Sequence, residues 1–200
     1  MASTKAAVVS DFRRAQILDA ARAAFARHGL ADTTIDHIAR GARVAKGTVY
    51  LYFRSKDEIL RQLLDDALAE LYRETVPPLA APGPCREKLR QFLERTLDFF
   101  DRHRDLLEQC HFELTPDMRR KARRAVGRIF TAQTKAWQAE LARAARGRRV
   151  RAVSSRRAAC GVVSLAYGLG QQRLRGWAAE PRDQAVAWAS ALLLKGLAVS

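Results

Sequence analysis

A short run at residues 44–53 places a cation and three hydroxyl groups close together. The polar members of this run are Lys46, Thr48, Tyr50 and Tyr52. Each of these side chains can donate a hydrogen bond, and Lys46 adds a positive charge. Val49 and Phe53 lie between and after them, so one short helix could bury these two apolar side chains and present the polar groups to an anionic partner.

A second short segment precedes this run and predicts the element that positions it. Ile35, Ile38 and Ala39 repeat at helical spacing and indicate one apolar face. Thr33 and Thr34 stand just before that face, where a hydroxyl can accept from the free N–H groups of a first helical turn. Two short helices joined tightly in this order are typical of a helix-turn-helix, whose second helix enters the major groove of DNA.

The same residues resemble the DNA-binding domain of TetR-family transcriptional regulators over roughly the first third of the chain. The resemblance rests on Val44–Phe53 (VAKGTVYLYF), Ser55–Leu60 (SKDEIL), Ile17–Ala21 (ILDAA), Ala24-Phe25, Gly29, Thr33-Thr34 and Ile38-Ala39. It implies an all-α fold, with an N-terminal three-helix helix-turn-helix domain and a C-terminal helical domain for ligand binding and dimerisation.

The first turns of a recognition helix reach base edges, so Lys46 could donate to guanine and Thr48 to a base or a phosphate. Gly47 would let the backbone approach DNA closely, and the phenols could donate to phosphates. The predicted DNA-binding residues are Thr34, Lys46, Gly47, Thr48, Tyr50, Tyr52 and Lys56. The resemblance implies DNA contacts at the same positions. Partial core packing is an equally good interpretation of Tyr52.

Two residues depart from the family pattern at the joint. Arg43 stands where the family usually has glycine, and Ala45 stands where serine or threonine usually opens the recognition helix. An arginine with positive φ and a missing hydroxyl cap each cost on the order of 1 kcal/mol. Gly41 could shift the joint by two residues, so we expect the fold to survive with an altered recognition-helix angle.

Composition favours an all-helical protein that acts in the cytoplasm. The chain is 48% hydrophobic, which is enough for a core, and shows no alternating strand pattern. It has no apolar signal segment and no apolar run near the ~20 residues of a membrane span. The net charge of +15 suits nucleic acid, yet residues 1–60 hold ten Lys or Arg and six Asp or Glu, a net +4. Basic blocks at 119–124 and 143–157 carry much of the excess, either as solvated surface or as a second anionic contact.

Catalytic and metal-binding patterns are absent from the sequence. We find no Ser-His-Asp order, phosphate-binding loop or glycine fingerprint, so the chain is not expected to be an enzyme or to hold a cofactor. Cys85, Cys110 and Cys160 are odd in number and widely spaced, which predicts reduced thiols. His103 and His111 near the second cysteine could form a metal sensor, but no further ligand lies at metal spacing, so we expect no metal.

The helical pattern divides the chain into three parts. Residues 1–56 are the predicted DNA-binding domain, which opens with a disordered polar tail of about ten residues; 57–76 are a connecting helix; and 77–200 are the effector-binding and dimerisation domain. Gly29 is expected to end the first helix, and the proline-rich run 77–84 marks the domain boundary. The predicted helices are 12–28, a short helix that carries Ile35, Ile38 and Ala39, and then 45–53, 55–76, 86–103, 104–114, 116–145, 155–177 and 181–199.

The C-terminal part offers candidates for two further surfaces. A small-molecule pocket combines aromatic walls with a few polar groups. The candidate pocket residues are Phe100, His111, Phe130, Gln133, Trp137, Tyr167 and Gln171. The last two helices are apolar on more than one face, which indicates burial within the chain or between subunits. The candidate dimer residues are Val162, Val163, Ala166, Gly170, Ala189, Leu192 and Leu193.

Together these features predict a ligand-responsive transcriptional repressor. Its partners would be double-stranded DNA with a palindromic operator, a small-molecule effector and a second copy of the chain. Two alternatives remain open: a non-specific architectural DNA-binding protein that uses the basic blocks, and a helix-turn-helix activator that acts through a protein partner.

Overall fold

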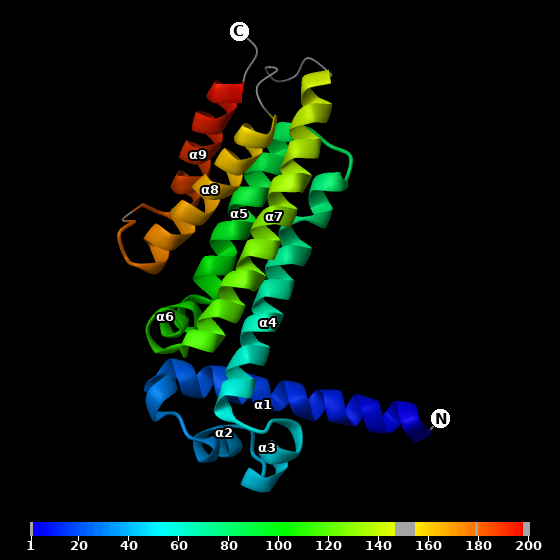
Figure 1. Ribbon diagram of the computed structural model, residues 1–200, viewed down its shortest axis with the longest axis vertical. Coiled ribbons are helices and arrows are strands. Elements are labelled where there is room, and N and C mark those ends of the chain that lie inside the picture. The colour runs from blue at the N-terminus through cyan, green and yellow to red at the C-terminus, as the bar shows by residue number, and fades with distance from the viewer. Residues whose placement is uncertain (1, 147–154, 179, 198–200) are drawn as a thin grey trace. The chain divides into compact units, whose positions relative to one another are not determined.

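The computed structural model describes residues 2–146, 155–178 and 180–197, and these contain α-helices, one 3-10 helix and connecting loops (Figure 1). The elements are α1 (Ala2–Asp32), α2 (Ile35–Gly41), α3 (Lys46–Tyr52), α4 (Lys56–Thr75), η1 (Pro77–Ala80), α5 (Cys85–Arg102), α6 (Arg104–Glu113), α7 (Pro116–Arg146), α8 (Ser155–Leu174) and α9 (Arg182–Leu197). The all-α prediction is therefore confirmed. None of the described helices is long and apolar enough to cross a membrane.

The chain forms two compact units. The first comprises residues 1–66 and 105–120, and the second comprises residues 67–104 and 121–200. The three boundaries fall within α4, after the first residue of α6 and within α7. The three-part division predicted from the sequence stays a prediction.

The predicted disordered tail is wrong, because α1 begins at Ala2 and runs through it. The segment contains no proline or glycine before Gly29 and several alanines, the strongest helix former, so nothing in it ends a helix. Gly29 does interrupt the helix as predicted, with φ 74° and ψ 166°. The Thr33 hydroxyl donates to the carbonyl oxygens of Ala24 and Gly29, which secures the chain reversal behind this break.

The proline-rich run after α4 is ordered as a 3-10 turn, which the sequence pattern did not predict. α4 ends at Thr75, two residues before Pro77, because a proline disfavours helical geometry in the residue before it. Leu79 within the turn is buried and joins the core of the second unit. The run therefore returns the chain into α5 through a packed turn.

The core of the second unit lies among α5, α7, α8 and α9. α5 contacts both α8 and α9, and Figure 1 shows these helices side by side. Phe92 of α5 meets Trp137 of α7 edge to face, with ring centroids 5.4 Å apart. The same core encloses one ion pair, between Lys88 and Glu140, whose N–O distance is 2.8 Å and whose side chains are 6% and 4% exposed.

Five of the predicted dimer residues belong to this intramolecular core, and their assignment to a subunit interface is corrected here. The five buried residues are Val162, Val163, Ala166, Gly170 and Ala189. They are covered by the chain's own helices, since α8 packs on α5 and on α9. Of the remaining two, Leu192 is 50% exposed and Leu193 is partly buried.

Candidate DNA-binding interface

The joint between α2 and α3 is a Schellman turn built on Arg43. The N–H of Val44 donates to the Ala39 carbonyl and the N–H of Arg43 donates to the Arg40 carbonyl, at 3.0 and 3.1 Å. This pair of bonds defines the motif, and it requires a left-handed residue at the position usually taken by glycine. Arg43 supplies that residue with φ 53°. The joint has therefore not moved to Gly41, and the arginine bears the backbone strain that the sequence predicted.

Gly41 has a different role, which is to let two helices approach closely. A Cβ at this position would come 3.3 Å from the Cβ of Ala20 on α1. The Gln16 amide of α1 also donates to the Ala42 carbonyl at 2.9 Å. α1 therefore supports the end of α2 just before the joint.

The N-terminus of α2 is capped by a reciprocal pair. The hydroxyl of Thr34 accepts from the backbone N–H of His37 at 3.2 Å, and the Thr34 N–H donates to Nδ1 of His37 at 3.4 Å. This confirms Thr34 as the N-cap residue. A capping hydroxyl at a helix N-terminus lies where a phosphate would be favoured by the free N–H groups and the helix dipole.

α3 presents a polar surface above a small apolar anchor. Val49 and Phe53 are buried, as the sequence predicted. Tyr50 is 49% exposed and Leu51 is 82% exposed. Gly47 has no heavy atom within 4 Å of where a Cβ would stand, so this turn of α3 faces open space. The exposed apolar Leu51 was not identified from the sequence, because helical spacing alone did not distinguish it from a core position.

The ammonium group of Lys46 lies 2.9 Å from the carboxylate of Asp36 on α2. Both side chains are about half exposed, at 51% and 53%. The hydrogen bond and charge of Asp36 raise the pKa of Lys46, so this side chain stays cationic at neutral pH. An exposed pair of this kind is easily exchanged, and Lys46 can therefore turn from the carboxylate to a DNA acceptor. Sequence reasoning missed Asp36, which is ten residues away on another helix.

The N-terminus of α4 is held by a capping pair, Ser55 and Glu58, and by the side chain of Lys56. The hydroxyl of Ser55 accepts from the Glu58 N–H at 3.2 Å, while the Glu58 carboxylate accepts from the Arg54 N–H at 2.7 Å. The ammonium group of Lys56 donates to the carbonyl oxygens of Leu30 and Ala31. Lys56 thus ties α4 to the end of α1, and a phosphate contact would use its remaining N–H.

Seven residues predicted to bind DNA are thereby placed on one unit, on α2, on α3 and at the start of α4. Thr48 and Tyr52 are partly buried, whereas Thr34, Lys46, Gly47 and Tyr50 are exposed. The family model for bacterial regulatory proteins of the tetR family matches residues 17–63, the segment that contains this arrangement. Residues 17–63 therefore form a TetR-family helix-turn-helix domain.

Known proteins similar to this chain include a curated repressor and two solved structures. The transcriptional repressor SCO4008 of Streptomyces coelicolor is 33% identical over 100 residues, which are 50% of this chain and 48% of that protein. A TetR-family regulator from Mesorhizobium loti superposes with a TM-score of 0.74 at 18% identity, covering 95% of this chain and 98% of that one. FadR from Bacillus subtilis, solved with stearoyl-CoA, gives 0.67 at 19% identity, covering 90% and 97%.

The matched segment spans about half the length of the curated relative, while the structural likeness extends over nearly the whole chain. The family model covers the helix-turn-helix segment, and the structural likeness shows the fold.

Not all of the residues predicted to line an effector pocket lie together in the core of the second unit. Phe100, Gln133 and Trp137 are buried in the second unit, and Tyr167 and Phe130 are partly buried beside them. Gln171 is corrected, because it is exposed on α8 directly after the buried Gly170. The side chain of His111, and that of Cys110 with it, lies outside the described residues. Sequence reasoning missed Thr75, which accepts a hydrogen bond from the Gln133 amide at 2.7 Å.

Metal ligands do not gather in the described part of the chain, where no group of three or more His, Cys, Asp or Glu could hold an ion. Cys85 and Cys160 are free thiols, and burial raises the pKa of Cys85 to about 11. In the second basic block, residues 147–154 lie outside the described residues.

Replacing Ala45 by serine is expected to stabilise the DNA-binding unit. Ala45 occupies the N-cap of α3 with φ −67° and ψ 150° and makes no side-chain cap bond. A serine hydroxyl there could accept from the N–H of Gly47, or share that of Thr48, which already donates to the Ala45 carbonyl; such a cap contributes about 1 kcal/mol. Urea unfolding of the full chain measures the gain. Ala26→Ser on the exposed side of α1 is the matched control and should cost about 0.5 kcal/mol; an equal effect of both would contradict a cap.

Proposed function

We propose that this chain is a transcriptional repressor that acts in the cytoplasm, binds a palindromic operator as a homodimer and is released by a small-molecule effector. Residues 1–56 would read the DNA, 57–76 would form the connecting helix, and 77–200 would bind the effector and the second subunit. The observation that carries the proposal is the exposed polar surface of α3, on which Lys46, Gly47 and Tyr50 are open to solvent while Val49 anchors the helix.

The DNA contacts follow from what each exposed group can donate. Lys46 and Thr48 would approach base edges from the first turns of α3, and Gly47 would let the backbone follow. Tyr50, Tyr52 and Lys56 would donate to phosphates, and Thr34 would place another phosphate at the N-terminus of α2. Phosphate contacts fix position and base contacts select sequence, so Lys46 and Thr48 are the proposed specificity residues.

The second subunit would cover the exposed side of α8 and α9. This side is hollowed by a pocket of about 540 Å³, with Gly168, Leu165 and Trp188 among its lining residues. Trp188 is 54% exposed and Leu192 is 50% exposed, and both lie on α9. Large exposed apolar side chains gathered on one surface are typical of an interface. A two-fold dimer would then read half-sites about 34–36 Å apart, or a multiple of that spacing.

The effector would bind in the core of the second unit. Aromatic side chains from α5, α7 and α8 meet there around a buried amide. FadR, which has the same fold, was solved with stearoyl-CoA, so the fold can be occupied by a ligand. Effector binding would favour the conformer of α4 that no longer fits the operator, since a ligand shifts an equilibrium only by its difference in affinity for two states.

Footprinting of the full chain on the DNA around its own gene, titrated with salt, tests this function. A protected palindrome that is lost as salt rises is the expected result, because phosphate contacts release counterions. Uniform coating without a protected site would overturn the repressor and support the architectural alternative. Protection accompanied by increased transcription in a reconstituted assay would support the activator.

A further inference from the structure

Three polar atoms in the core of the second unit are buried without a hydrogen-bond partner among the described residues. They are Oε1 of Gln133, Nε1 of Trp137 and the phenol oxygen of Tyr167. Gln133 and Trp137 are fully buried, at 0% exposure. Buried polar groups in proteins are almost always bonded, and an unpaired one is destabilising. Three such atoms on the neighbouring helices α7 and α8 therefore indicate groups to which a ligand could supply the missing bonds.

The structure fixes which atom of the Gln133 amide is free. The Thr75 hydroxyl donates to the Leu71 carbonyl at 2.6 Å, and this uses its only hydrogen. The same hydroxyl can then only accept, and it accepts from Nε2 of Gln133 at 2.7 Å. The amide is therefore oriented with its nitrogen toward α4 and its oxygen unpaired, so the free group at this point is an acceptor.

Two free donors accompany this acceptor. Trp137 follows Gln133 by one helical turn on α7, and its indole N–H can only donate. Tyr167 of α8 lies near the Gln133 side chain, whose N–H interaction lowers the phenol pKa, while the phenol's own hydrogen has no acceptor among the described residues. Burial is the larger effect and raises the pKa of Tyr167 to about 12. The phenol is therefore neutral and retains its hydrogen for donation.

Aromatic rings surround these polar atoms. The Tyr167 ring meets Phe100 and Phe130 edge to face, with centroids 5.9 and 5.8 Å away. Phe100 lies directly against Gly170, where a Cβ would come 2.2 Å from the ring. Because Gly170 has no side chain, the Phe100 ring packs directly on helix backbone at this point.

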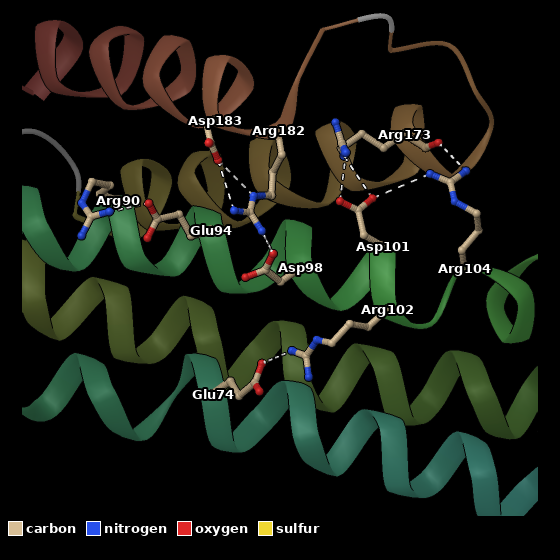
Figure 2. Close-up of polar contacts among 10 residues, drawn as sticks. All are labelled: Glu74, Arg90, Glu94, Asp98, Asp101, Arg102, Arg104, Arg173, Arg182 and Asp183. Carbon is tan, nitrogen blue, oxygen red and sulfur yellow. Dashed lines mark hydrogen bonds and ion pairs between the residues drawn. The ribbon is translucent and has the colours of Figure 1, made fainter. Parts of the chain in front are cut away.

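Charged groups on the described helices of this unit form ion pairs with one another. Figure 2 shows carboxylates of α4 and α5 meeting arginines of α5, α8 and α9. The pairs are Arg173–Asp101, Arg182–Asp98 and Arg102–Glu74. The buried side chains of Lys88 and Glu140 likewise form an ion pair with each other. A charged ligand would have to lose its hydration without gaining an unpaired counter-charge, which is unfavourable in a protein interior.

We propose that the effector is an uncharged aromatic molecule carrying a hydroxyl group. Its ring lies among Phe100, Phe130 and Tyr167, and its hydroxyl donates to Oε1 of Gln133 while accepting from the N–H of Trp137 or the hydroxyl of Tyr167. This inference rests on the proposed function, in that it names the ligand of the proposed effector site. It excludes a carboxylate or an amine as the group that faces Gln133.

Calorimetric titration of the full chain with three naphthalene probes tests the proposal. The probes are naphthalene, 2-naphthol and 2-naphthoate, which share one ring system and differ in the polar group. We expect 2-naphthol to bind about tenfold more tightly than naphthalene, the gain from a well-placed hydrogen bond, and at least tenfold more tightly than 2-naphthoate. Equal or tighter binding of 2-naphthoate would overturn the proposal, as would no binding of 2-naphthol at millimolar concentration.

Two variants assign the preference to the Gln133 amide. Gln133→Leu keeps the size of the side chain and removes the acceptor, so it should abolish the preference for 2-naphthol while naphthalene still binds. Gln171→Leu on the exposed side of α8 is the matched control and should retain the preference. A preference that survives Gln133→Leu would refute the assignment. Bound naphthalene confirms that this variant is folded.

Footprinting without any probe separates this inference from the proposed function. A protected operator together with no preference for 2-naphthol would refute the proposed ligand class and still support the proposed repressor function. A clear preference for 2-naphthol together with no protected operator would refute the proposed repressor function and still support the proposed ligand class.

Discussion

Lys46→Ala is expected to weaken operator binding by roughly tenfold or more at fixed salt, because the dimer loses one donor to DNA in each half-site. The loss should be larger than that of a simple phosphate contact. In this variant the Asp36 carboxylate no longer has the Lys46 ammonium group 2.9 Å away, so its uncompensated negative charge repels the DNA. Tyr50→Ala, on the next turn of the same helix, should weaken binding in the same direction. Gel-shift titration against the footprinted operator measures both.

Two controls make this expectation specific to the proposed reading surface. Asp36→Ala releases Lys46 and removes a negative charge, so it should leave binding unchanged or tighten it. Arg156→Ala changes an exposed cation of the second basic block and should hardly affect the affinity. If Arg156→Ala and Lys46→Ala weakened binding equally, the assignment of α3 as the reading helix would be wrong, and the basic blocks would be the binding surface.

Glu140→Leu is expected to destabilise the chain by about 3–5 kcal/mol, the cost of leaving a buried charge without its partner. Lys88 is then left with the Leu79 carbonyl as its described hydrogen-bond partner, at 3.0 Å. Lys88→Met should cost less, since Glu140 keeps its pair with Arg143. Removing both charges in Lys88→Met/Glu140→Leu should recover most of the loss. Urea unfolding of the four proteins measures the coupling of the two residues.

The matched control is an exposed ion pair. Arg61 and Asp65 on α4 lie 2.9 Å apart with side chains 47% and 51% exposed. Asp65→Ala should change the free energy of unfolding by only about 0.5 kcal/mol, because water screens this pair. A double variant as unstable as Glu140→Leu alone would show that the buried pair contributes packing that apolar side chains of similar size do not replace.

The DNA-binding unit could be predicted in detail because its deciding interactions are local. The Thr34 cap joins residues three positions apart, and the turn at Arg43 joins residues five positions apart. The break at Gly29 needs only one residue that tolerates φ 74°. Such short-range interactions depend on residue types at fixed spacing, so the sequence determined the capping, the joint and the order of the helices. The same reasoning failed at the N-terminus, where polar composition was taken for disorder although no residue there ends a helix.

Only the tertiary structure decided which distant residues meet. Lys46 pairs with Asp36 ten residues away, and Gln133 bonds to Thr75 across 58 positions. The apolar pattern of α8 was compatible with a subunit interface, yet Val162 and Val163 are covered by the chain's own helices.

Helical periodicity determined that a face of α8 is buried but not what buries it, because the hydrophobic effect is non-directional and any apolar surface satisfies it. The partners of Gln133, Lys46 and Val162 were set by the packing of whole helices, in which residues far apart in the chain compete for the same neighbours.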